Sequence, residues 1–114
     1  MLSIESLKEY GADVDAALGR CLNNKDFYLK LVLMIKDESN FDVLKEALSQ
    51  KDYTKAFEAA HALKGVVTNL SLGPLEKAVV EITELLRHRE DVDYKPYLDK
   101  VLEERDNLFN LIDN

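Results

Sequence analysis

The chain has 114 residues, 46% of them hydrophobic, which is enough for one domain over residues 1–114 with one core. Its 15 Lys and Arg are scattered among 22 Asp and Glu, and the formal net charge of −7 leaves no basic block for a phosphate backbone, so we expect no binding to nucleic acid. The longest apolar run, Leu31–Ile35, is too short to span a membrane, and the N-terminus lacks the basic and apolar regions of a signal peptide, so we expect a cytoplasmic protein without membrane attachment.

The first third of the chain predicts helices of different character. Apolar residues recur at three- and four-residue spacings, which indicates short helices over Ile4–Tyr10, ending at Gly11, and from Asp13 to about Leu22. The only cysteine, Cys21, has no partner for an internal disulfide and no nearby His for a metal site, so we expect it to be buried. The segment Lys25–Lys36 is apolar on more than one side, which is typical of a helix buried on several sides or of one that exposes an apolar patch.

Four further helices follow, and each has a recognisable start. After the interruption "DESN", Ser39 or Asn40 is positioned to cap a continuation through Leu48. Asp52 is positioned to cap a helix over Tyr53–Leu72, which the turn "SLGP" ends. A helix starting at Pro74 then runs to "RHRED", and a last helix is expected with Asp93 as its cap and Pro96 in its first turn. This pattern predicts an all-α fold, an up-and-down four-helix bundle with one or two short N-terminal helices.

The expected helix Tyr53–Leu72 has an unusual outward face. At about 100° per residue, the side opposite His61 carries six apolar residues, namely Ala56, Ala59, Leu63, Val66, Val67 and Leu70. His61 therefore faces outward, and the residues expected to share its stripe are Thr54, Phe57, Lys64, Gly65 and Thr68. A glycine in a helix interior costs about 1 kcal/mol relative to alanine, and an aromatic ring is unexpected on a solvated face.

This outward stripe combines groups suited to phosphoryl chemistry. An exposed imidazole is largely neutral at cytosolic pH, and its free ring nitrogen is a nucleophile. Lys64 lies three residues after His61, where its cation would attract a phosphoryl group on the ring, and Gly65 leaves space for another macromolecule. The stripe has no general base or second carboxylate, which argues against an independent enzyme. The second histidine, His88, lies in a charged helix terminus, where a cation complements the helix dipole.

The stretch "AHALKG", Ala60–Gly65, resembles the A-H-x-L-K-G signature of histidine-containing phosphotransfer (HPt) domains of two-component phosphorelays. The resemblance extends to "GADVDAALGRCLNNKDFYLKLVLMI" and "LKEALSQKDYTKAFEAAHALKG". It implies that His61 accepts a phosphoryl group from the aspartate of one receiver domain and passes it to another, that Lys64 stabilises phosphohistidine, and that Gly65 gives the partner access. It also implies that Mg²⁺ belongs to the receiver and that this chain holds no metal or cofactor of its own.

The expected partners are response-regulator receiver domains and a histidine kinase, hybrid or not, bound by a monomer. The possible docking surface comprises Thr54, Phe57, Thr68 and Asn69, and the helix edge of Phe27, Leu31 and Met34 is either core only or an extension of that surface. Ser71 replaces a glycine common in the family, which puts a sharp left-handed helix ending in doubt. Two alternatives stay open, an interaction module that is never phosphorylated and the phosphoacceptor domain of a larger hybrid or chemotaxis-type kinase.

Overall fold

The structure, a computed structural model, describes residues 2–114, and this part of the chain is all helical, as predicted. Its elements are seven α-helices and one 3₁₀-helix, η1: α1 (Ile4–Tyr10), α2 (Val14–Arg20), α3 (Lys25–Leu33), η1 (Met34–Asp37), α4 (Asn40–Ser49), α5 (Tyr53–Asn69), α6 (Gly73–Arg87) and α7 (Lys95–Asp113).

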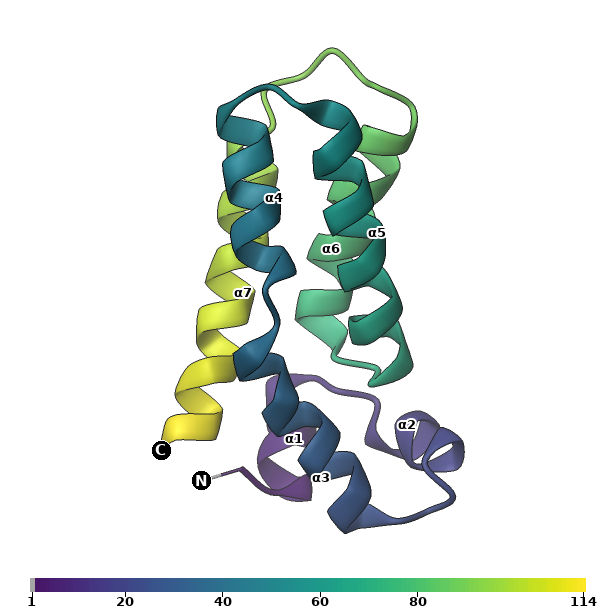
Figure 1. Cartoon of the computed structure of the whole chain (residues 1–114). Coiled ribbons are helices and arrows are strands. Elements are labelled where there is room, and N and C mark those ends of the chain that lie inside the picture. The colour runs from purple at the N-terminus through teal and green to yellow at the C-terminus, as the bar shows by residue number, and fades with distance from the viewer. Residues whose placement is uncertain (1) are drawn as a thin grey trace.

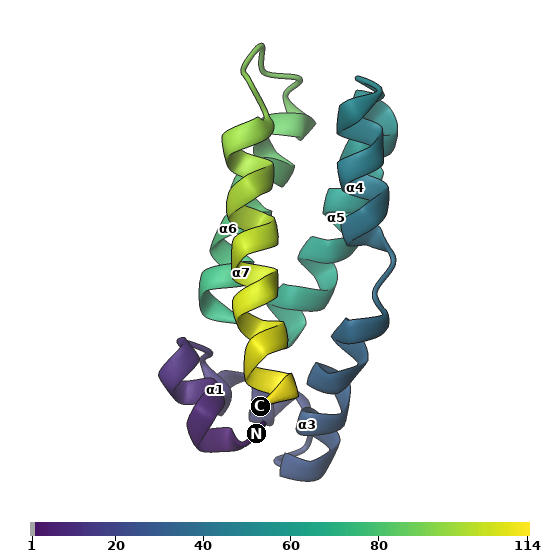
Figure 2. The same cartoon turned by 90° about the vertical axis from the view of Figure 1, so that its left-hand side faces the viewer.

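Helices α4 to α7 form the up-and-down bundle, with α4 against α5, α5 against α6 and α6 against α7 (Figure 1). Helices α1 to α3, which we call the N-terminal cap, lie at the end of the bundle near the α5–α6 turn (Figures 1 and 2). Three helices therefore precede the four-helix bundle, where the sequence predicted one or two short ones. Helix α3 does not continue into α4, because η1 and the extended residue Glu38 lie between them.

The helix starts agree with the sequence to within one residue, and two caps differ from the expected ones. Tyr94, and not Asp93, is at the cap position of α7, although the Asp93 carboxylate accepts from the backbone N–H of Lys95 at 3.0 Å. Ser39 precedes α4, but its side chain makes no capping bond; instead the Glu38 carboxylate accepts hydrogen bonds from the backbone and side-chain nitrogens of Asn40, both at 3.0 Å. The expected cap by Ser39 or Asn40 is therefore wrong, because the longer acidic side chain one residue earlier reaches the free N–H. Asp52 caps α5 as predicted, accepting from the backbone N–H of Lys55 at 3.1 Å.

One continuous core joins the cap to the bundle. Its fully buried large side chains come from every part of the fold and include Leu7, Tyr28, Ile35, Leu44, Leu63, Ile82 and Leu108. Cys21 is buried and free, as expected. Burial of apolar surface at roughly 25 cal/mol per Å² is the main force that holds such a core together.

Helix α5 ends three residues earlier than expected, and residues of the N-terminal cap hold this end in place. Ser71 has φ +51°, so the sharp left-handed ending that its identity put in doubt is present. The backbone N–H of Ser71 donates to Thr68 O, and that of Leu72 donates to Val67 O. These two hydrogen bonds form the pattern of a Schellman motif at the C-terminus of the helix. Asp13 N–H donates to Ser71 O at 2.9 Å, and the buried phenol of Tyr28 donates to Leu70 O at 3.0 Å. The cap thus fixes a backbone conformation that serine alone disfavours.

Candidate functional site

His61 lies in the middle of α5 with its side chain exposed, as the helical projection predicted. It borders a shallow depression of about 430 Å³ on the outer face of the helix, which we call the His61 depression. The lining residues are Arg20, His61, Lys64, Gly65, Thr68 and Asn69. Five of the six belong to the predicted site or to its predicted docking surface, and the sixth, Arg20, was not predicted.

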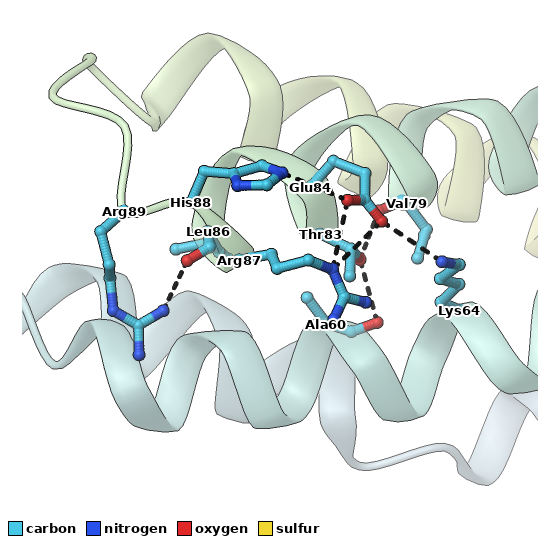
Figure 3. A network of polar contacts seen from close by, with 9 residues as sticks. All are labelled: Ala60, Lys64, Val79, Thr83, Glu84, Leu86, Arg87, His88 and Arg89. Atoms are coloured by element: carbon cyan, nitrogen blue, oxygen red, sulfur yellow. Dashed lines mark hydrogen bonds and ion pairs between the residues drawn. The ribbon is translucent and has the colours of Figure 1, made fainter.

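The opposite side of α5 is the core side that the projection expected. Ala56, Ala59, Leu63, Val67 and Leu70 are buried, whereas Val66 is half-buried. Ala60 is also buried, which the projection did not predict. Helix α6 packs beside it, and the hydroxyl of Thr83 lies within hydrogen-bonding distance of Ala60 O, at 3.2 Å (Figure 3). The contact with α6 therefore widens the buried side of α5.

The ring of Phe57 lies on the His61 side of α5, as the projection predicted, and is half-buried there. It stacks on the His61 imidazole with ring centroids 5.7 Å apart and an interplanar angle of 22°. The guanidinium groups of Arg87 and Arg89 lie 5.1 and 5.9 Å from its centroid, at cation–π distance. Phe57 thus supports the side of His61 nearer the N-terminus of α5.

Thr54 lies away from the His61 depression. It is exposed in the first turn of α5, and its hydroxyl oxygen is 3.4 Å from Arg89 Nη2. Of the four residues in the expected docking surface, Thr68 and Asn69 line the depression and Phe57 adjoins His61 through its ring. Thr54 is the member that the structure does not bring to the site.

Lys64 is half-buried and already has an anionic partner. Its ammonium lies 3.3 Å from Glu84 Oε1 on α6, and the same carboxylate pairs with Arg87 at 3.2 Å and approaches His88 Nε2 at 3.9 Å (Figure 3). Desolvation disfavours the ionised carboxylate, but the hydrogen bond from Lys64 and the charges of Arg87 and Lys64 outweigh it and hold the pKa of Glu84 below its ordinary value. The lysine is therefore oriented beside His61 by α6.

Gly65 is exposed, and a Cβ built on it would meet no atom within 4 Å. Internal packing therefore does not require a glycine here. Gly65 and Asn69 line both the His61 depression and a second hollow of about 650 Å³, which we call the apolar groove. The groove is further lined by Leu31, Met34, Ile35, Glu38, Ala62, Val66 and Leu70. Gly65 thus occupies the place where the two hollows meet.

The predicted apolar edge of α3 is partly at this groove. Leu31 and Met34 line it, and Met34 is 58% exposed. Phe27 is 48% exposed but does not line the groove. The edge is therefore divided between the groove and the free surface of the cap.

Arg20, at the end of α2, is the site residue that sequence reasoning missed. Its Nε donates to Asn69 O at 2.9 Å, and its Nη2 donates to Thr68 O at 3.1 Å and to Ser71 Oγ. An arginine in the last turn of a short helix is typical of a simple complement to the helix dipole. Only the placement of the cap against α5 reveals its position beside the His61 depression.

Neither a membrane-spanning helix nor a cluster of metal-ligating side chains is present in residues 2–114. No helix in this range combines the length and the apolar character that a membrane crossing requires. The same residues contain no group of three or more His, Cys, Asp or Glu side chains arranged to hold a metal ion.

Comparison with known families gives one match. A family model described as the Hpt domain matches residues 34–111, which is more than half of the chain and includes α4 to α6, His61 and most of α7. No curated protein and no solved structure gives a significant match. The residues outside the match are mainly those of α1, α2 and α3. With its four-helix bundle and an exposed histidine on α5, the chain belongs to the family of Hpt domains, which transfer phosphoryl groups through histidine in phosphorelays.

Proposed function

We propose that His61 is the phosphoacceptor and that the domain carries a phosphoryl group between two receiver domains. The observation that supports this most directly is an exposed imidazole on a rigid helix, beside a cation and a residue without a side chain, inside the range that the Hpt model matches. The domain acts as a carrier, because the described site contains the nucleophile and leaves the rest of the chemistry to the partner.

The transfer step is a displacement at phosphorus. A ring nitrogen of His61 donates its lone pair to the phosphorus of an aspartyl phosphate, and the bond between phosphorus and the aspartate oxygen breaks. The aspartate leaves as a carboxylate, and the phosphorylated ring sheds its N–H proton to solvent or retains it. The second transfer reverses these bonds toward another aspartate. Mg²⁺ belongs to the acidic pocket of the receiver in this scheme.

Lys64 would stabilise the phosphorylated form. A phosphoryl group brings nearly two negative charges and three acceptor oxygens to the helix surface. The Lys64 ammonium is one turn from His61 and is held by the partly exposed Glu84 carboxylate, so it can exchange one anionic partner for another with a small movement of its flexible side chain. We expect the Lys64–Glu84 pair to be present before transfer and to weaken after it.

Gly65 would let the receiver approach the imidazole. The surface around it combines the His61 depression with the apolar groove, and Thr68 and Asn69 extend the first while Leu31 and Met34 extend the second. We assign this joined surface, together with Phe57, as the docking surface for the receiver. The polar depression can orient a docked protein through hydrogen bonds, and the apolar groove can bury apolar surface of that protein.

The test is phosphoryl transfer from receiver domains of the source organism that have been phosphorylated with acetyl phosphate. We expect acid-labile phosphate on the protein, its transfer to a second receiver, and complete loss of labelling in His61→Gln with an unchanged unfolding midpoint. A protein that binds receivers but never carries acid-labile phosphate would instead be an interaction module. Labelling that persists in His61→Gln would show that another residue is the phosphoacceptor.

A further inference from the structure

Arg20 reaches the phosphoacceptor face from a helix that lies outside the Hpt match. Its guanidinium is fixed at the end of α5 by Thr68 O, Asn69 O and Ser71 Oγ. A long flexible side chain is thus held in one orientation before any partner arrives. Pre-organisation of this kind removes part of the entropy cost that an arginine pays when it binds an anion.

The guanidinium retains unused donors. Arginine has five N–H groups, and the three hydrogen bonds occupy Nε and Nη2. Among residues 2–114, no hydrogen bond leads from Nη1, and Arg20 forms no ion pair with a carboxylate. The side chain is exposed, so two N–H groups on a fixed cation remain for a partner.

The charge around Arg20 favours an anion. The described residues that line the His61 depression include Arg20, Lys64 and His61 but no Asp or Glu. Arg20 also covers carbonyl groups at the C-terminal end of α5, where the helix dipole would otherwise present partial negative charge. Because Lys64 is paired with Glu84, Arg20 is the cation of this depression whose charge no carboxylate offsets.

Arg20 lies too far along the helix to act on the transferred group. Thr68, whose carbonyl it binds, follows His61 by two helical turns, or roughly 10 Å along the axis. A contact at that distance belongs to the body of a docked protein. Arg20 is therefore a candidate for orienting the partner at the rim of the site.

We propose that Arg20 binds a surface carboxylate of the docked receiver and thereby determines affinity for, and choice among, receivers. This inference rests on the proposed function, since it names a contact made by the receiver that delivers or accepts the phosphoryl group. With Nε and Nη2 occupied, Nη1 can donate a charge-assisted hydrogen bond to one oxygen of an Asp or Glu side chain, and the guanidinium adds a full positive charge. The N-terminal cap thus contributes a specificity-determining residue to a reaction centred on α5.

The experiment measures transfer rate against receiver concentration and salt for the full chain and its variants. For Arg20→Gln we expect the KM for the phosphorylated receiver to rise about 5- to 20-fold with a maximal rate within about twofold of the parent, as for loss of one interfacial charge contact. The salt dependence of transfer should become shallower, because one charge pair is gone. Arg20→Lys, which retains the charge but loses the hydrogen bonds that hold the guanidinium on the end of α5, should give an intermediate KM.

Two control variants separate binding from structural support. Lys8→Gln removes the same charge from an exposed position on α1 and should leave KM and salt dependence at parental values. Ser71→Ala removes one acceptor of Arg20 but keeps the guanidinium, so it should lower the unfolding midpoint without flattening the salt dependence. Equal KM and salt profiles in Arg20→Gln and Ser71→Ala would reduce Arg20 to a structural residue and overturn the proposal.

Direct labelling of His61 by phosphoramidate distinguishes this proposal from the proposed function. Arg20→Gln should be labelled at the parental rate, since no receiver takes part. If the parent protein takes label from phosphoramidate and from receivers, while Arg20→Gln keeps the parental KM and salt dependence, the Arg20 proposal alone is wrong. If the parent protein takes no label from any receiver, the proposed function fails and the Arg20 proposal fails with it.

Discussion

The two sides of α5 consist of different kinds of residue, and they differ in how much change of side-chain size they tolerate. The inner side consists of small and aliphatic side chains such as Ala56, Ala60 and Leu63, each with 0% exposure. The outer side has a histidine that stacks on Phe57, a lysine paired with Glu84, and a glycine with open space around it. Because interiors are close-packed whereas the outer face has open space, inner substitutions should change stability and outer ones should change transfer.

Leu63→Ala gives the strongest test of the inner side. Leu63 is completely buried two residues from His61, so its truncation should lower the free energy of unfolding by about 2–5 kcal/mol. Denaturant unfolding followed by circular dichroism measures this loss. At a temperature where the variant remains folded, transfer through His61 should stay within about twofold of the parent rate. A large loss of transfer in the fully folded variant would show that the two sides of α5 are coupled.

Gly65→Gln tests the outer side in the opposite way. The side chain would project into the junction of the two hollows, so transfer from a phosphorylated receiver should slow by about tenfold or more, or roughly 1.4 kcal/mol. The unfolding midpoint should rise, because glycine is about 1 kcal/mol less favourable than alanine in a helix interior and glutamine lies between them. Gly65→Ala should transfer at an intermediate rate and should raise the midpoint at least as much as Gly65→Gln. Quenched time courses of phosphoryl transfer and thermal unfolding of the same samples provide the comparison. Equal transfer rates in all three proteins would show that the receiver does not need the space that Gly65 leaves.

Much of this division could be predicted from the sequence, because it depends on local rules. Helical periodicity identifies the inner and outer sides of α5, and Asp52 marks the start of the helix through an ordinary capping bond. The exposed position of His61 follows from the same projection. Such features require only the residues within a few turns of each other.

The features that the sequence did not predict arise where another element comes close. Phe57 is half-buried because Arg87 and Arg89, from the end of α6 and the residues after it, lie near its ring. Ser71 takes a left-handed conformation that its own preferences oppose, because the cap supplies hydrogen bonds to that turn. Arg20 reaches the site through tertiary packing alone. Contacts between residues distant in sequence leave no periodic signal that a single sequence can show.

Lys64→Gln tests whether the cation or its ion pair serves transfer. Removal of the ammonium should lower the transfer rate by about 3- to 10-fold, the range expected for one charge-assisted contact at an exposed site. Glu84→Gln breaks the same ion pair but keeps the ammonium, so it should transfer at the parental rate or faster. Rapid-quench measurements of phosphohistidine formation distinguish the two variants. Equal slowing of both would assign the effect to the orientation that Glu84 gives to Lys64.

Tyr28→Phe tests the connection between the cap and the end of α5. The buried phenol donates to Leu70 O, so its loss should lower the free energy of unfolding by about 1 kcal/mol. Burial raises the pKa of Tyr28 to about 12, above the unfolded value of about 10, so its stabilising effect is complete below pH 10 and is lost as the pH rises toward 12. The difference in stability between parent and variant should therefore shrink from pH 9 to pH 12 in urea unfolding. A constant difference over that range would mean that ionisation of this phenol does not govern the hold of the cap on α5, and that the remaining contacts, those of Asp13 and Arg20 at Ser71, hold the turn without it.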